Sequence, residues 1–340
     1  SCRQNQADHP RAIIEQRSSR VASPSNGTRV RWGDELVFSV AAEDSSAIID
    51  SVRIAMNGKP SGNFSGTTYV YRTKEGKLGS ILVSIEVFVK NKPRDLHSLM
   101  IYVLADAAPA EYSCRVLNTY PHDPTSYTQG LVYHNGYVYE STGLHKRSKL
   151  RKLNYRTGQV LAEYKLDDSN FGEGIVIAND RIYQLTWNEK IGFVYTLDGF
   201  KIVKHFNLPS SEGWGMAFDG KQFFTSDGSN RLYILDTAML AKTGELQVMD
   251  EKGKVDNLNE MEYVNGVIYA NVYQTNLIVM IDPATGKVTG RIDCSGLLKQ
   301  EDRHADIDVL NGIAYLPQTK HFLITGKNWP KMFEVEWVRK

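Results

Sequence analysis

Short runs of β-branched and aromatic residues, separated by turn residues, follow one another along nearly the whole of this chain. Tyrosine is abundant, with 18 residues. Side chains of these two kinds are enriched in strands, and many short strands punctuated by turns are typical of all-β folds. The pattern therefore predicts an all-β protein.

The first group of expected strands lies between about residues 30 and 104. Turn sequences such as Asn57-Gly58-Lys59-Pro60 separate these strands. Strands at this spacing predict an immunoglobulin-like β-sandwich, which we place at residues 25–108. We find no catalytic constellation in it. The expected strands are residues 35–40, 49–56, 68–71, 81–89 and 97–104.

A strand, a tight turn and a second strand recur through the rest of the chain. Each copy begins roughly 40 to 50 residues after the previous one, which is the period of a four-stranded propeller blade. Five copies predict a five-bladed β-propeller over residues 109–340, closed by pairing of residues 112–120 with 332–337. The copies begin at Leu131, Ile175, Met216, Met261 and Ile313.

Polar and aromatic residues flank the expected inner strands of this propeller. In such a fold these positions converge on one mouth of the central channel. An aromatic-walled pocket with a carboxylate, amides and one lysine suits a small polar ligand and not a polymer. The residues are Gln129, Glu140, Glu173, Trp187, Trp214, Asp227, Asn259, Glu260, Tyr273, Asn311, Lys327 and Trp329.

Glu173 stands between Gly172 and Gly174, directly before an apolar strand. The strand should hold this carboxylate at the end of a rigid element, which suits a proton-transfer group. The alternative is that Glu173 caps a turn. For Glu140, Asp227 and Glu260 we favour a structural interpretation, in which they connect neighbouring blades through hydrogen bonds or surround a structural cation in the channel.

Charge and cysteine content narrow the choice of function. The chain has 40 basic and 39 acidic residues, which argues against a nucleic-acid partner. We interpret the basic segment at residues 146–152 as a solvated loop and strand face. The cysteines, Cys2, Cys114 and Cys294, have no short spacing and indicate neither a metal site nor a disulfide framework.

Cys2 precedes a polar segment without a strand period. A cysteine followed by a polar linker and then folded domains is the arrangement of a mature bacterial lipoprotein. We therefore expect a tether at residues 1–24, a lipid anchor at Cys2 and a place in the bacterial cell envelope, in the periplasm or on the outer surface. The alternative is an incidental exposed cysteine.

Ten short motifs follow in order with blade-like spacing between about Tyr112 and Glu336. They are Tyr127-Thr128-Gln129-Gly130-Leu131, Glu140-Ser141-Thr142-Gly143, Phe171-Gly172-Glu173-Gly174, Leu185-Thr186-Trp187, Gly213-Trp214-Gly215, Ser226-Asp227-Gly228-Ser229, Asn257-Leu258-Asn259-Glu260-Met261-Glu262, Asn271-Val272-Tyr273, Asn311-Gly312-Ile313-Ala314 and Thr325-Gly326-Lys327-Asn328-Trp329-Pro330. This series resembles that of the plant and bacterial glutaminyl-peptide cyclotransferases. The sandwich lies outside the resemblance.

The resemblance implies a five-bladed propeller that converts an N-terminal glutamine to pyroglutamate and releases ammonia without a catalytic metal or other cofactor. It implies peptide or protein substrates. A closed propeller has no need to assemble, so we expect a monomer. Tyr127 stands where Phe is common and Tyr273 where Trp is common, but both remain aromatic. The positions that match the family's motifs are Tyr127, Gln129, Phe171, Glu173, Trp187, Trp214, Asn259, Tyr273 and Lys327.

The chemistry of cyclisation suggests a role for each position. Glu173 is the expected proton shuttle, and Lys327 and Asn259 are the expected donors to the oxyanion. Gln129 and the aromatic residues would bind the substrate. The alternatives are a surface propeller that binds a peptide or glycan without catalysis, and a metal-dependent lyase. A lyase should use histidine, but the eight histidines do not occupy repeat-equivalent positions.

Overall fold

A computed structural model describes residues 17–340, in which every regular element is a β-strand apart from two short 3-10 helices, η1 (Thr73–Glu75) and η2 (Gln300–Asp302). The protein is therefore all-β, as predicted. No helix in the described residues is long and apolar enough to span a membrane. The chain forms two compact units. Unit 1 comprises residues 17–30, Asp34–Thr73 and Ser80–Tyr102, and unit 2 comprises Arg31–Gly33, Lys74–Gly79 and Val103–Lys340.

Unit 1 is built on a three-stranded and a five-stranded sheet. Each expected strand of this region lies within an observed one, and alternate residues of the long strand β7 are buried. The three-stranded sheet has the order β1 (Ser19–Ser23), β3 (Glu35–Ala42) and β6 (Thr68–Arg72). The five-stranded sheet has the order β2 (Thr28–Arg31), β8 (Asp95–Leu104), β7 (Gly79–Val89), β4 (Ile49–Met56) and β5 (Lys59–Phe64).

The expected tether at residues 1–24 is wrong at its C-terminal end, because β1 pairs with β3. Ser19 is buried, and its backbone N–H and hydroxyl both donate to the Asp95 carboxylate, at 2.7 and 2.6 Å. Hydrogen bonds to a charged acceptor thus attach a strand whose only large apolar residue is Val21, so the hydrophobic pattern did not reveal it. Cys2 and its expected lipid anchor lie outside the described residues.

Unit 2 contains three four-stranded antiparallel sheets and one eight-stranded sheet. The four-stranded sheets are β10 (Thr128–His134), β11 (Tyr137–Thr142), β12 (Lys149–Asn154) and β13 (Gln159–Lys165); β14 (Gly172–Ala178), β15 (Arg181–Thr186), β16 (Ile191–Thr196) and β17 (Ile202–Asn207); and β18 (Met216–Phe218), β19 (Phe223–Ser226), β20 (Arg231–Leu235) and β21 (Lys242–Gln247). The eight-stranded sheet runs β22 (Leu258–Val264), β23 (Val267–Val272), β24 (Leu277–Ile281), β25 (Val288–Asp293), β9 (Ala110–Pro121), β28 (Lys331–Arg339), β27 (His321–Gly326) and β26 (Leu310–Leu316).

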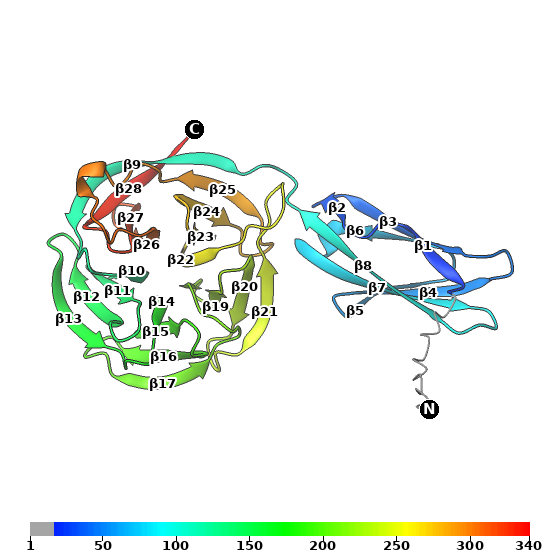
Figure 1. Ribbon diagram of the computed structural model, residues 1–340, viewed down its shortest axis with the longest axis horizontal. Coiled ribbons are helices and arrows are strands. Elements are labelled where there is room, and N and C mark those ends of the chain that lie inside the picture. Colours follow the sequence, from blue (N-terminus) through cyan, green and yellow to red (C-terminus); the bar gives the residue numbers. More distant parts are fainter. Residues whose placement is uncertain (1–16) are drawn as a thin grey trace, which may run out of the picture. The chain divides into compact units, whose positions relative to one another are not determined.

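The inner strands of unit 2 form a closed ring, which Figure 1 shows around a common centre. In cyclic order β10, β14, β18, β22 and β26 each contact the next, and β26 contacts β10. Each inner strand begins one of the repeats expected from the sequence. The arrangement is consistent with a propeller.

Strand β9 closes the ring. It pairs with β28, as expected from the sequence, and the structure sets the register, with Met332 opposite Tyr120 and Trp337 opposite Cys114. Its other edge pairs in parallel with β25, which the sequence did not predict. Two groups of strands thereby merge into one sheet, and neither β25 nor β28 keeps a free edge along that pairing.

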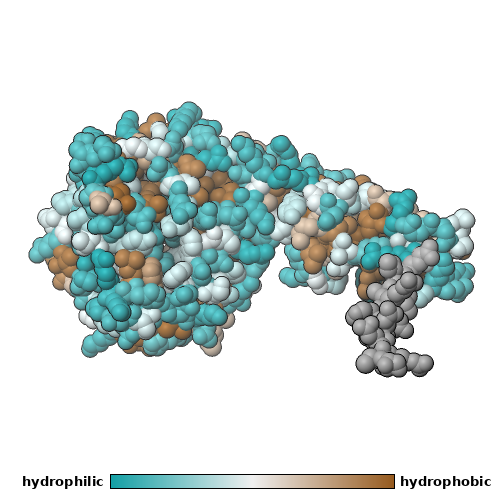
Figure 2. Space-filling view, viewed as in Figure 1, coloured by the Kyte–Doolittle hydropathy of each residue, from teal (hydrophilic) through white to brown (hydrophobic). Residues whose placement is uncertain are grey.

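The surface of unit 2 is mainly polar on the face seen in Figure 2, and hydrophobic residues form small, scattered groups there. Its apolar residues are concentrated instead in clusters between neighbouring sheets. The inner strands therefore rest on packed cores, and such cores can hold the residues at the strand ends in fixed positions.

Candidate active site

The inner strands carry an irregularity at equivalent positions. Pairing shifts between Thr128 and Gly130 in β10, between Gly172 and Ile175 in β14, and between Leu258 and Met261 in β22. A β-bulge bends its strand and re-aims the side chain that has no partner. Gln129, Glu173 and Asn259 all stand at these shifts, so each is displaced from the ordinary alternation of its strand.

Glycines beside these residues allow the inner strands to approach closely. The Gly174 N–H donates to the Trp214 carbonyl at 2.8 Å, and a Cβ added at Gly174 would lie only 2.7 Å from that oxygen. A Cβ at Gly130 would lie 2.6 Å from the backbone nitrogen of Ile175. The glycine after Glu173 is thus required by the contact between neighbouring strands.

All nine residues expected from the sequence line one cavity of about 450 Å³. Leu144 and Glu212 also line it, and the sequence reasoning missed both. Glu212 lies outside every strand and repeat motif, and Leu144 is an ordinary apolar residue of a loop, so neither gave a signal. The lining residues are Tyr127, Gln129, Leu144, Phe171, Glu173, Trp187, Glu212, Trp214, Asn259, Tyr273 and Lys327.

Aromatic rings in mutual contact form much of the cavity wall. The Phe171 ring lies 6.4 Å from that of Tyr127 and 5.4 Å from that of Trp187, measured between centroids. Trp214 and Tyr273 meet edge to face at 5.3 Å. Such contacts limit the movement of each ring, so the wall is preformed.

Glu212 connects the group of rings that contains Trp187 with the pair formed by Trp214 and Tyr273. One carboxylate oxygen, Oε2, accepts the indole N–H of Trp187 at 3.0 Å and that of Trp214 at 2.8 Å. Both indoles therefore keep a fixed orientation and have no polar hydrogen free for a ligand.

Lys327 contacts two rings of the wall, those of Tyr127 and Tyr273. Its Nζ lies 4.6 Å from the centre of the Tyr127 ring and 4.9 Å from that of Tyr273. Among residues 17–340 no hydrogen-bond acceptor is paired with this Nζ, although the side chain is buried. The cation is held by two aromatic faces, and its N–H donors are available to a ligand.

Glu173 is only 4% exposed, and its Oε1 accepts a hydrogen bond from Gln129 Nε2 at 3.1 Å. Burial raises the pKa of Glu173 well above its ordinary value, opposed by Lys327 and reinforced by Glu189 and Glu212. Burial also lowers the pKa of Lys327, against the effect of the Glu173 and Asp308 carboxylates. The pKa values of both groups are therefore shifted toward neutral pH, and a group with such a pKa exchanges a proton with an amine most readily.

Two buried carbonyl oxygens beside these groups have no partner. Gln129 Oε1 and Asn259 Oδ1 accept no hydrogen bond within the described part of the chain. Leaving such an atom unpaired is costly, so the position is suited to a donor brought by a ligand. An amine or a carboxamide NH₂ would supply one.

The other residues expected at the mouth do not line the cavity. Glu140 accepts a hydrogen bond from buried His122 at 3.0 Å. Glu260 accepts the backbone N–H groups of Leu131 and Ile313, at 3.3 and 2.7 Å, and so links β22 to two other inner strands. These contacts agree with the interpretation that the carboxylates connect blades. Asn311 donates to Thr128, Asp227 accepts from Tyr233, and Trp329 lies in an apolar cluster.

No three His, Cys, Asp or Glu side chains gather as a metal site would within residues 17–340. The charged and amide groups that line the cavity are the carboxylates of Glu173 and Glu212, the amine of Lys327 and the amides of Gln129 and Asn259. This set can move a proton and can stabilise an oxyanion.

Comparison with known proteins identifies the family. The sequence model of glutamine cyclotransferases matches residues 93–337. A glutaminyl-peptide cyclotransferase from Arabidopsis thaliana is 41% identical over 226 residues, which cover 65% of this chain and 70% of the relative. The crystal structure of glutaminyl cyclase from Myxococcus xanthus has a TM-score of 0.64 and 35% identity, covering 68% of this chain and 99% of that one. This chain therefore belongs to the glutamine cyclotransferase family.

Proposed function

We infer that this protein is a glutaminyl-peptide cyclotransferase, which converts the N-terminal glutamine of peptides to pyroglutamate. The α-amine attacks the side-chain carboxamide carbon, a C–N bond forms in the new ring, and the original C–N bond breaks to release ammonia. The observation that carries this function is a cavity in which a buried carboxylate, a buried amine and two unpaired carbonyl oxygens meet inside aromatic walls.

We propose that Glu173 moves the proton in this reaction. Its carboxylate takes a proton from the attacking amine and delivers it to the departing nitrogen. A raised pKa suits both steps, because the carboxyl group must accept and then release the proton near neutral pH. The hydrogen bond from Gln129 supports the assignment by orienting Oε1.

Lys327 and the Asn259 NH₂ group are proposed to stabilise the oxyanion that forms on the former carboxamide oxygen. Lys327 is held by ring faces and not by a carboxylate, so its N–H donors need not be freed before they bind an oxyanion. Asn259 lies at a bulge of β22 and lines the same cavity. The unpaired oxygens of Gln129 and Asn259 are proposed acceptors for the substrate's amine and carboxamide hydrogens.

The aromatic wall is proposed to fold the glutamine side chain toward its own amine. An intramolecular attack gains most when the reacting atoms are held close together, and a preformed wall supplies that constraint. Tyr127, Phe171, Trp187, Trp214 and Tyr273 would also keep water away from Glu173. No step in this scheme requires a metal or another cofactor.

We further propose that unit 2 is a five-bladed propeller and that unit 1 is an immunoglobulin-like sandwich. The closed ring of inner strands supports the first assignment, and two sheets with one alternately buried long strand support the second. The enzyme is proposed to act as a monomer, because a closed ring of inner strands needs no second chain to complete it. Anchoring at Cys2 in a bacterial cell envelope stays a prediction.

The activity is tested by following ammonia release and pyroglutamate formation from glutaminyl-alanine amide in the presence of EDTA. We expect turnover that survives chelation, because the proposed catalytic groups are all side chains. Loss of turnover in EDTA, restored by a divalent cation, would contradict the cofactor proposal. No turnover on several glutaminyl peptides would leave the protein as a binding module for peptides or glycans.

A further inference from the structure

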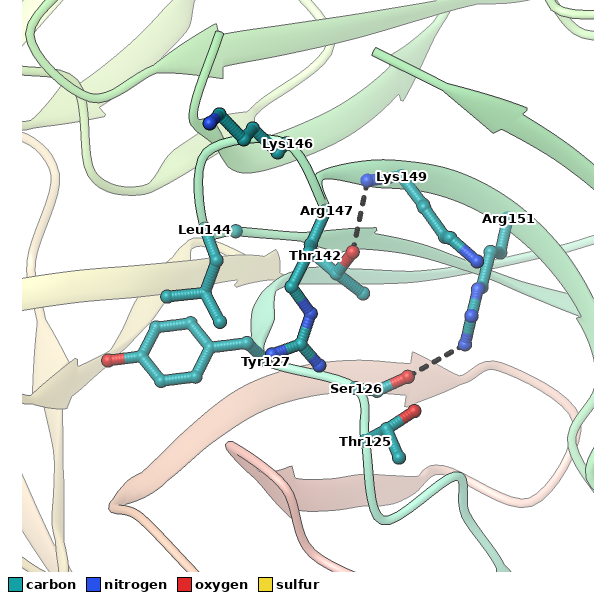
Figure 3. Close-up of a pocket in the computed structure, with 10 residues that line it drawn as sticks. Thr125, Ser126, Tyr127, Thr142, Leu144, Lys146, Arg147, Lys149 and Arg151 are labelled. Carbon is teal, nitrogen blue, oxygen red and sulfur yellow. Dashed lines mark hydrogen bonds between the residues drawn. The ribbon is translucent and has the colours of Figure 1, made fainter. Parts of the chain in front are cut away.

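A second cavity of about 200 Å³ adjoins the first, and the two share Tyr127 and Leu144 as walls. Figure 3 shows it between the turn that precedes β10 and the loop that joins β11 to β12. Its lining contains four basic residues and no acidic residue: Thr125, Ser126, Tyr127, Thr142, Gly143, Leu144, Lys146, Arg147, Lys149 and Arg151.

Two of the four cations are already neutralised. Arg151 donates to Asp123 at 2.8 Å and to Glu163 at 2.9 Å. Lys149 pairs with the other oxygen of Glu163 at 2.9 Å. Carboxylates outside the cavity therefore offset these charges and hold the side chains in place.

The remaining cations, Lys146 and Arg147, have exposed side chains for which no carboxylate or other acceptor is found among residues 17–340. In Figure 3 the Arg147 side chain extends toward Tyr127 and Ser126, whereas that of Lys146 points away from them. An arginine can bind a carboxylate through two parallel N–H groups. Arg147 is thus the cation placed to meet an anion in this cavity.

The loop that carries Arg147 is held by hydrogen bonds at both ends. The Gly143 N–H donates to the Tyr127 carbonyl at 2.8 Å, and the Arg147 N–H donates to the Leu144 carbonyl at 3.1 Å. Ser148 Oγ also donates to that carbonyl, at 2.8 Å, and accepts the Gly172 N–H at 2.9 Å. The loop is therefore tied to the residue before Glu173, so the second cavity keeps its position relative to the first.

We propose that this second cavity is a subsite for a carboxylate on the substrate residue that follows the N-terminal glutamine. The inference rests on the proposed function, because it requires glutamine to occupy the first cavity. The Cα atom of the next residue lies about 3.8 Å from that of the glutamine, and we place its side chain or its free carboxylate at the wall of Tyr127 and Leu144 that the two cavities share. Acidic second residues and short free-acid peptides are then preferred substrates.

The test compares kcat/KM for glutaminyl-glutamate amide with that for its neutral counterpart, glutaminyl-glutamine amide. We expect the wild-type enzyme to prefer the acidic peptide about 3- to 10-fold at low salt, and the preference to shrink in 0.5 M NaCl. Arg147→Gln should abolish the preference. The exposed Lys201, which lines neither cavity, provides a matched control, and Lys201→Gln should keep it.

Glutaminyl-alanine with a free and with an amidated C-terminus distinguishes the two sources of carboxylate. If the wild-type enzyme prefers the free acid and Arg147→Gln removes this preference, the subsite binds the terminal carboxylate. If the enzyme prefers only the peptide with a glutamate side chain, the subsite binds the side-chain carboxylate. Equal kcat/KM values in the wild-type enzyme within both pairs, glutaminyl-glutamate amide against glutaminyl-glutamine amide and free against amidated glutaminyl-alanine, would overturn the subsite. Failure to turn over any of these peptides would instead overturn the proposed function.

An independent observation concerns two cysteines that line neither cavity. Cys114 lies in β9, and Cys294 directly follows β25, which pairs in parallel with β9. Their Sγ atoms lie 2.7 Å apart, and Cys294 is buried. Strand pairing thus brings together two residues separated by 180 positions.

We propose that Cys114 and Cys294 form a disulfide when the protein meets a thiol oxidant such as oxidised glutathione. The two thiols lose two protons and two electrons, and the oxidant is reduced to two glutathione thiols. The new bond would add a covalent link between β9 and the end of β25, its parallel neighbour in the eight-stranded sheet. Because the two residues are far apart in sequence, such a bond restricts the unfolded chain strongly.

The test is mass spectrometry of a digest made without reductant after incubation with oxidised glutathione, together with thermal unfolding. We expect peptides joined through Cys114 and Cys294, and a melting temperature that falls by about 5 to 15 °C on reduction. Cys114→Ser should show no such fall. Absence of the joined peptides would overturn the disulfide, and an unchanged melting temperature would overturn its stabilising role.

Discussion

Glu173→Gln should lower kcat by about 100- to 10,000-fold, the range that positioned acid–base groups contribute. Glutamine keeps the shape of the side chain and can still contact Gln129, but it cannot take up and return a proton. The measurement is steady-state pyroglutamate formation at neutral pH. Asp180→Asn, at an exposed turn, provides a control that removes a carboxylate elsewhere in unit 2 and should keep full activity.

Thermal unfolding separates this catalytic effect from a folding defect. The folded-state pKa of Glu173 is raised above its unfolded value, so wild-type stability should decrease as pH rises through the folded pKa. Glu173→Gln cannot ionise, so its melting temperature at neutral pH should equal or exceed that of the wild type. Near-normal kcat in a folded variant would move the proton shuttle to another group.

The pH dependence of kcat/KM offers a second readout of the same group. The acidic limb should have its midpoint above the ordinary glutamate value of about 4.5, because burial disfavours the carboxylate. Glu173→Gln should lose this limb along with most of its activity. A midpoint at an ordinary carboxylate value would indicate that an exposed group controls the rate.

Lys327→Met should lower kcat by about 100- to 1,000-fold, the usual cost of removing one oxyanion donor. Methionine keeps an unbranched chain between the Tyr127 and Tyr273 rings but removes the charge and all three donors. Removal of this cation should also raise the pKa of Glu173 further, because Lys327 opposes the effect of burial there. The acidic limb of kcat/KM should therefore move to higher pH.

The exposed Lys320 supplies the matched control for this variant, since Lys320→Met removes the same charge from the turn between β26 and β27. It should leave kcat and the pH profile as in the wild type. If Lys327→Met raised KM alone and kept kcat, Lys327 would be a substrate-binding residue and not an oxyanion donor.

Much of the fold could be predicted because its determinants are local. Alternating strands and their turns lie close together in the sequence, so each inner strand pair was recognised from its own residues. Strand β1 was missed because its attachment depends on Asp95, 76 positions away. The pairing of β9 with β25 was missed for the same reason, since a strand pattern does not specify a parallel partner.

The residues of the cavity could be named from the sequence, but their arrangement could not. The motif series placed Glu173, Asn259 and Lys327 on repeats whose ends converge, and the structure brings them to one cavity. Glu212 belongs to none of the repeated motifs. Its place in the wall becomes visible only in the structure, where it accepts the indole N–H groups of Trp187 and Trp214. The basic residues around Arg147 were interpreted as solvated, because sequence does not reveal which charges find a partner.

The order of residues was enough to establish the strand pattern, the period of the repeat and the identity of the groups that can carry the chemistry. These are properties of residues that are close together in the sequence, and they can be recognised without knowing which distant residues contact one another. The pKa shifts of Glu173 and Lys327, the unpaired oxygens of Gln129 and Asn259, and the adjoining basic cavity arise only in the folded chain. The physical reason is that burial, Coulomb interaction and hydrogen-bond pairing depend on distances between residues that lie on different strands.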